Sequence, residues 1–182
     1  MQTRARRPGV LGAAAALALG VALTACSPAF NWREARPQGS GVALMFPCRP
    51  AHEERRVRIG TAVLPIQIDA CSAGAVHFSL AFVDAAEATE VTPLLEALRH
   101  QSLANLSGTE TATSAFAPPG ATPNPQSARV AITGARPDGR RVVADAAFFV
   151  KGLRLFQASV LGADDSRGRE AADTFVGAIR LP

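Results

Sequence analysis

The last third of the chain contains three stretches with the alternating apolar pattern of β-strands, separated by two short turns. The stretches cover residues 128–133, 140–150 and 153–161, and the turns are Pro-Asp-Gly at 137–139 and Lys-Gly at 151–152. Connections this short join antiparallel neighbours, because a parallel pair needs a crossover of a dozen or more residues. This part of the chain therefore predicts an antiparallel meander.

Residues 62–70 and 75–83 are expected to form a second hairpin in the first half of the chain. Each stretch has apolar residues at every second position, which indicates one buried face. If the two apolar sets share that face, His77 lies opposite Asp69 or Gln67 on the adjacent strand. The other expected strands cover 31–35, 42–46, 52–59 and 109–116.

Two segments have helical periodicity instead. The first has Thr92 as N-cap and Pro93 at the first helical position, and its leucines continue at helical spacing until Gly108. The second covers residues 165–179. Strands, one helix, more strands and a last helix predict a single α+β domain over residues 41–182. Its expected architecture is one antiparallel sheet of about seven strands packed by two helices.

The first 25 residues have the layout of a secretory signal peptide. Arg4, Arg6 and Arg7 precede an apolar run over residues 10–23, which ends in small residues before Cys26. An uncleaved transmembrane anchor is one alternative, but the run is shorter than the roughly 20 residues that span a bilayer. Ordinary signal cleavage, which would release a protein with a spare thiol, is another.

The end of this run, Leu23-Thr24-Ala25-Cys26, resembles the lipobox of bacterial lipoprotein precursors. The resemblance implies cleavage between Ala25 and Cys26, a diacylglyceryl group on the Cys26 sulfur and a fatty acyl chain such as palmitate on the new amino terminus. Residues 1–25 are then the signal peptide, and residues 26–40 are the lipidated N-terminus and tether. Ser27 in place of aspartate favours an outer-membrane protein that faces the periplasm.

The basic character of the chain belongs largely to this leader. The full chain has a formal charge of +4, but 16 basic and 15 acidic residues remain after residue 25. A nearly neutral body does not suit nucleic-acid binding, which depends on neutralising phosphates. We therefore expect the membrane as a partner through the lipid anchor, with an envelope protein as a further candidate and no nucleic acid.

The three cysteines also fit a lipoprotein. Lipidation of Cys26 leaves Cys48 and Cys71, an even pair in an oxidising compartment. We predict a disulfide between Cys48 and Cys71; two buried free thiols are the alternative. Neither cysteine has the spacing of a redox or metal motif, and the three histidines of the chain do not either, so the sequence predicts no metal site and no cofactor.

The body of the chain resembles the PsbP and Mog1-like proteins. The stretch Phe46-Pro47-Cys48-Arg49-Pro50 is similar to a Phe-Pro-Gly-Lys-Pro stretch of bacterial relatives, and residues 175–181 are similar to their closing helix. The resemblance implies an antiparallel sheet packed by helices. Cys48 replaces the glycine of that pattern, and the resemblance carries over no ligand site.

The one candidate polar site consists of Asp69, His77 and Ser79, which the expected hairpin would place on its non-core face. Acyl-transfer chemistry uses this set, with the acid orienting the imidazole and the imidazole activating the hydroxyl. A cross-strand polar pair without catalytic function is the plainer interpretation. Three functions thus remain: a non-catalytic binding or assembly module, a small envelope hydrolase, and a carrier of a small apolar ligand between sheet and helix.

Overall fold

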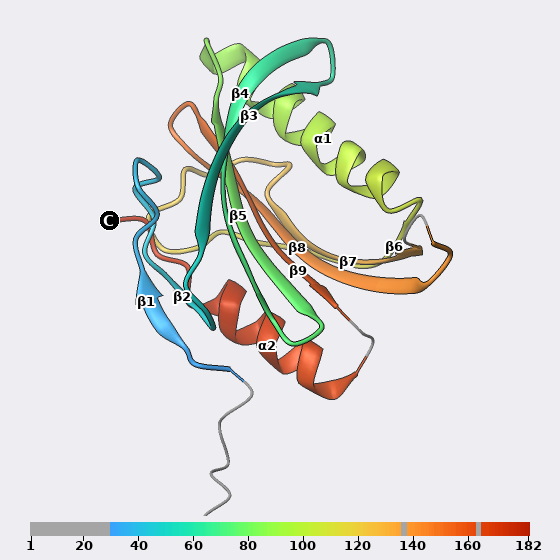
Figure 1. Ribbon diagram of the computed structural model, residues 1–182. Helices are drawn as coiled ribbons and strands as arrows, with labels where there is room; N and C mark the ends of the chain where they lie inside the picture. The colour runs from blue at the N-terminus through green and yellow to red at the C-terminus, as the bar shows by residue number, and fades with distance from the viewer. Residues whose placement is uncertain (1–29, 136–137, 163–164) are drawn as a thin grey trace, which may run out of the picture.

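The computed structural model describes residues 30–135, 138–162 and 165–182 (Figure 1). The lipobox at 23–26 and Pro137 of one expected turn lie outside these residues. The main element is an antiparallel sheet with seven strands in the order β3-β4-β5-β9-β8-β7-β6. These strands are β3 (Ala51–Ile59), β4 (Ala62–Ala73), β5 (Val76–Asp84), β6 (Thr109–Ala115), β7 (Ala128–Ala135), β8 (Arg141–Lys151) and β9 (Arg154–Gly162).

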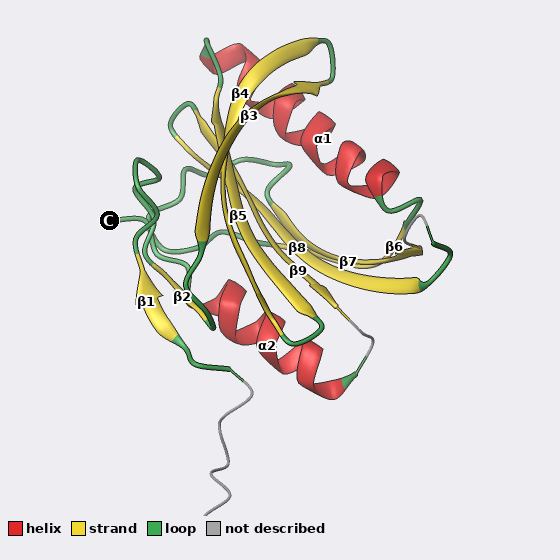
Figure 2. Cartoon of the chain, in the orientation of Figure 1, coloured by secondary structure: helices red, strands yellow, loops and turns green. Residues whose placement is uncertain are grey.

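Both faces of this sheet are covered, as Figures 1 and 2 show. Helix α1 (Ala88–Asn105) connects β5 to β6 and packs on one face, whereas helix α2 (Ser166–Gly177) follows β9 and packs on the other. A separate two-stranded sheet, β1 (Arg33–Ala35) and β2 (Leu44–Phe46), lies on the same side as α2. The predicted α+β class, with one main antiparallel sheet and two helices, is confirmed.

Helix α1 begins earlier than predicted. Thr92 and Pro93 lie within the helix, whose first residue is Ala88. The Glu90 carboxylate accepts a hydrogen bond from the Ala86 backbone N–H, which satisfies a donor just before the helix. Val91 is buried against the sheet and gives the first turn a packing contact. The proline is therefore tolerated near the helix start at the cost of one backbone hydrogen bond.

The register predicted for the β4–β5 hairpin is wrong. His77 lies opposite Ser72, and Asp69 lies opposite Leu80. The turn consists of Gly74 and Ala75, and Gly74 takes a positive φ of 61°, which suits a tight hairpin turn. This turn sets the register of the whole hairpin.

The physical reason for the error is that the sheet buries both of its faces. Ile66 and Ile68 of β4 face α1, whereas Phe78 and Leu80 of β5 face α2. Each strand can therefore contribute its apolar residues to a different core. The alternation of apolar and polar residues within one strand does not determine which helix covers its apolar face.

Residues 30–40, expected to be part of a tether, pack against the domain from Phe30 onward. The rings of Phe30 and Trp32 meet the edge of Phe78, with ring centroids 5.8 and 5.7 Å away. The predicted disulfide between Cys48 and Cys71 is present. It links the segment that follows β2 to strand β4, so the N-terminal segment is held to the sheet by packing and by a covalent bond.

A candidate ligand-binding pocket

A pocket of about 360 Å³ lies between helix α1 and the sheet. Its walls are formed by aliphatic side chains from both layers, and its lining also includes several polar groups. The aliphatic walls include Val57, Ile66, Ile68, Leu98, Leu106 and Ile132. Ligand pockets are typically concave, largely apolar and equipped with a few polar groups, and this pocket has those properties.

The pocket exists because small side chains stand on the sheet beneath the second half of α1. Ser79 of β5 lies opposite Ser159 of β9, which lies opposite Ala146 of β8. Ala81 and Ala144 extend this row of small residues. Close packing would require larger side chains at these positions, so a hollow remains between the two layers.

The polar groups on the floor of the pocket are hydrogen-bonded to one another. The hydroxyls of Ser79 and Ser159 are 2.7 Å apart. The Ser102 hydroxyl donates to the Leu98 carbonyl at 2.9 Å and lies 3.1 Å from the Gln157 side-chain amide. The atom at 3.1 Å is the Gln157 Oε1 oxygen, and because a hydroxyl has one proton, Ser102 donates to only one of these two oxygens at a time. The floor groups are therefore bonded mainly to one another, and one hydroxyl proton of the Ser79–Ser159 pair has no partner among the described residues.

The charged or titratable residues of the lining lie toward opposite ends of strand β4, since Arg55 is paired with Ile66 and His77 with Ser72. Arg55 and His77 are exposed and belong to the lining, and no Asp or Glu of the described residues is part of it. The His77 Nδ1 atom is 2.9 Å from the Ser72 hydroxyl. The charge that the lining presents at Arg55 is consequently positive, because the guanidinium is always protonated.

The structure does not bring the predicted polar set together. Asp69 is 5% exposed and lies on the α2 face, where its carboxylate contacts His52 Nδ1 at 3.2 Å. His77 and Ser79 lie on the α1 face and both line the pocket. The Ser79 hydroxyl bonds to Ser159 rather than to His77. No acid thus orients His77 in the described part of the chain, and the predicted hydroxyl–imidazole pair is not formed.

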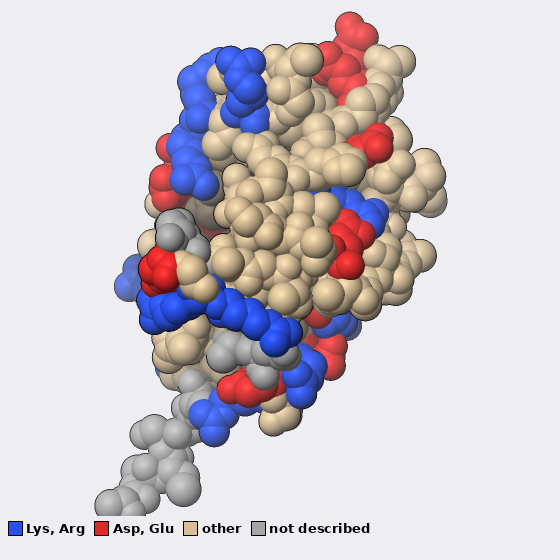
Figure 3. Space-filling view, turned by 90° about the vertical axis from the view of Figure 1, so that its right-hand side faces the viewer, with Lys and Arg blue, Asp and Glu red and all other residues tan. Residues whose placement is uncertain are grey.

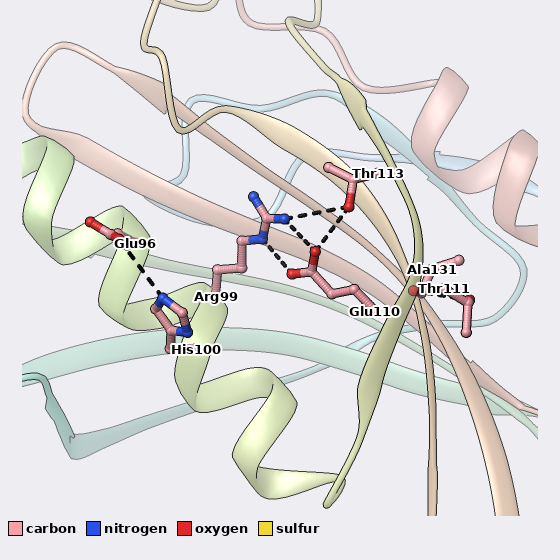
Figure 4. A network of polar contacts seen from close by, with 7 residues as sticks. All are labelled: Glu96, Arg99, His100, Glu110, Thr111, Thr113 and Ala131. Atoms are coloured by element: carbon pink, nitrogen blue, oxygen red, sulfur yellow. Dashed lines mark hydrogen bonds and ion pairs between the residues drawn. The ribbon is translucent and has the colours of Figure 1, made fainter.

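The position of α1 over the sheet is fixed by an ion pair with the edge strand β6 (Figure 4). Arg99 donates two hydrogen bonds to the Glu110 carboxylate, one of them from Nε at 2.6 Å. Thr113 donates a further bond to Glu110 at 2.9 Å. The bond from Arg99 is the main reason why the pKa of Glu110 is lowered, and Glu110 likewise raises the pKa of Arg99. Such charged pairs hold the helix above the pocket.

No protein-family model and no curated protein matches the chain. Across the described ranges, no three His, Cys, Asp or Glu side chains are grouped as a metal ion would require. No helix within those ranges has the length and apolar character needed to cross a membrane.

Proposed function

We propose that this protein is a lipid-anchored, non-catalytic binding module of the bacterial envelope, which holds a small amphipathic ligand between helix α1 and the sheet. The pocket of about 360 Å³, with aliphatic walls and a hydrogen-bonded polar floor, is the observation that carries this proposal. Of the three functions compatible with the sequence, this pocket supports the carrier of a small ligand best.

The proposed location rests on the leader and the cysteines. Lipidation of Cys26 would tether the chain to the outer membrane with the domain in the periplasm. Disulfides persist in oxidising compartments such as the periplasm, and the bond between Cys48 and Cys71 is compatible with that location. The likeness to PsbP and Mog1-like proteins is part of the proposal as well, supported by an antiparallel sheet packed by helices.

A hydrolase that uses Asp69, His77 and Ser79 has less support. Its acid lies on the other face of the sheet, and its hydroxyl is occupied by Ser159. An assembly module that contacts an envelope protein stays compatible with the proposal, since a ligand carrier must transfer its ligand to a partner.

Mass spectrometry tests the anchor. The intact protein, extracted from its native membrane, is expected to lack residues 1–25, to carry diacylglyceryl and acyl mass, and to resist alkylation until it is reduced. An unmodified chain would contradict the proposed anchor, and two thiols that react before reduction would contradict the oxidising compartment.

A neutral fluorescent probe tests the pocket. Both cores and the disulfide lie within residues 30–182, so the mature chain 26–182 with Cys26→Ser, secreted through a cleavable leader, contains the whole described fold. We expect N-phenyl-1-naphthylamine to bind it with increased emission. Ser159→Leu and Ser79→Leu, which place bulk on the floor, should each weaken binding about tenfold or more.

The matched control is Ala112→Leu, which adds a leucine at an exposed position of β6 outside the pocket. It should bind the probe as the wild type does, while circular dichroism shows that all variants are folded. Equal binding by all folded variants, or no binding by the wild type, would refute the proposed pocket.

A further inference from the structure

We infer that the ligand of this pocket is a single-chain amphiphile with one anionic head group, a fatty acid-like carboxylate, whose charge pairs with Arg55 while its chain lies beneath helix α1. This inference rests on the proposed function and names the chemical class of the ligand.

Charge complementarity at Arg55 is the first argument. Arg55 lies on the side of strand β3 that faces α1, opposite Ile66 of β4, and it has no hydrogen bond or ion pair in the described part of the chain. Arg99 of α1 and Arg154 of β9, by contrast, both have carboxylate partners. Arg55 is thus an unpartnered cation at the edge of an apolar pocket.

The surface around Arg55 has mixed charge outside the pocket. Lys and Arg side chains gather at the upper left of Figure 3 next to acidic ones, and strand β3 has Glu53 and Glu54 beside its three arginines. Of these arginines, only Arg55 lies on the side of the sheet that faces α1. The lining of the pocket contains Arg55 and His77 as its titratable groups and no carboxylate of the described residues. A cationic head group would meet repulsion here, whereas an anion would gain a charged hydrogen bond.

The state of the floor is the second argument. A sugar or another polar ligand needs protein groups that are free to bond with it. The hydroxyls of Ser79 and Ser159 bond to each other, and Ser102 is bonded to Leu98 and Gln157. A hydrocarbon chain can lie over these groups with their mutual bonds intact, and the aliphatic walls of the pocket favour such a chain. We therefore expect the part of the ligand that lies over these polar groups to be apolar.

The shape of the site is the third argument. A second, shallower hollow borders the pocket and shares His77, Asn105, Leu106 and Leu161 with it. The two hollows therefore adjoin along the C-terminal part of α1, near the β4–β5 turn. The pocket volume of about 360 Å³ is near the lower end of the range for small-molecule sites, roughly 300–1,000 Å³. The pocket beneath α1, taken by itself, therefore suits one acyl chain better than the two chains of a phospholipid.

Competition with the neutral probe tests the inference on the mature Cys26→Ser chain. Dodecanoate, dodecanol and dodecyltrimethylammonium share one chain length and differ in head-group charge. Below their micelle-forming concentrations at pH 7.5, dodecanoate should displace the probe about fivefold more tightly than dodecanol, and the ammonium compound should bind more weakly than dodecanol. Added salt should weaken dodecanoate alone.

Two arginine variants locate the head group. Arg55→Gln should reduce dodecanoate affinity about fivefold and leave dodecanol within about twofold of the wild type. Arg58→Gln is the matched control, because Arg58 has the same charge on the same strand but faces the other side of the sheet. It should leave both affinities within about twofold.

The outcomes separate this inference from the proposed function. If dodecanoate and dodecanol bind equally, or if the preference for the acid survives in Arg55→Gln, the anionic head group at Arg55 is refuted while the pocket stands. If neither the probe nor any of the three compounds binds the folded wild type, the proposed function fails together with it.

Discussion

Removal of the disulfide between Cys48 and Cys71 is expected to lower the free energy of unfolding by about 3 kcal/mol. The bond spans 23 residues of sequence, and a closed loop of this length restricts the unfolded chain by about that amount at 25 °C. For a domain of this size, each kcal/mol shifts the melting temperature by roughly 2–4 °C. Cys48→Ala with Cys71→Ala should therefore melt roughly 6–12 °C lower than the wild type.

The structure makes Trp32 a suitable reporter for this experiment. It is the single tryptophan of the chain, and it packs on Phe78 beside the segment that the disulfide holds. Urea unfolding followed by Trp32 fluorescence and by far-UV circular dichroism would measure the loss at the N-terminal segment and in the sheet. Alanine is the better replacement, because a reduced Cys71 thiol would lie 3.3 Å from the Cys48 carbonyl and regain a weak hydrogen bond.

Reductant supplies the control. It should bring the wild type most of the way down to the midpoint of the double variant, since the reduced Cys71 thiol keeps its contact with the Cys48 carbonyl, and it should leave the variant unchanged. Equal unfolding midpoints for the oxidised wild type and the variant would refute the reasoning. So would a reductant that lowers the midpoints of both proteins equally, because its effect would then not depend on this disulfide.

Two further predictions concern a surface ion pair and a close backbone approach. A hydrogen bond from Arg154 is the main reason why the pKa of Asp84 lies below its ordinary value of 3.8. The ion pair therefore stabilises the folded state fully above pH 3.8, and this stabilisation is lost as the pH falls through the lowered pKa of the folded state. Asp84→Asn should therefore lose less stability than the wild type between about pH 5 and pH 2.5 in urea titrations, and identical pH profiles would contradict the assignment. Gly134→Ala should lower the free energy of unfolding by about 1–3 kcal/mol, because the added Cβ would overlap the Leu106 carbonyl oxygen. Gly177→Ala is the control in the same assay, because a Cβ at that position meets no atom within 4 Å.

Much of the fold could be predicted from local patterns. Alternation located the strands, the even cysteine pair after lipidation gave the disulfide, and Gly108 marked the end of the first helix. The start of α1 was missed, because Pro93 is a strong local signal that the packing of Val91 overrides. The register of β4 and β5 was missed because it depends on which layer covers each face of the sheet.

The site could be predicted only in part. His77 and Ser79 were expected together on one face, and both line the pocket. Arg55, Ser102 and Gln157 were not identified as site residues, because their proximity depends on how α1 lies across three strands. A pocket between two layers depends on how the layers pack against each other, so the sequence contains no local motif for it. The available signal was the small residues on the pocket-facing side of three neighbouring strands: Ser79 and Ala81 of β5, Ser159 of β9, and Ala144 and Ala146 of β8.

The distribution of aromatic residues explains why the hollow lies on this face. Eight of the nine phenylalanines belong to the core between the sheet and α2, and Phe148 is the one in the core beneath α1. Phe149 and Phe156 stack there at 4.9 Å, and Trp32 adds a further ring. The bulky rings thus fill the α2 side, whereas the α1 side is built from aliphatic and small residues.

This asymmetry assigns separate roles to the two faces and predicts separate effects of mutation. Substitutions that fill an existing hollow commonly stabilise a protein, because they add apolar contacts without removing others. Ser159→Leu adds such contacts but removes the hydrogen bond to Ser79, so we expect the melting temperature to change little while probe binding weakens about tenfold or more. Phe175→Ala, on the packed face, should instead cost about 3–5 kcal/mol. A large loss of stability in Ser159→Leu would show that the small residues are needed for packing, and the argument that they leave room for a ligand would then fail.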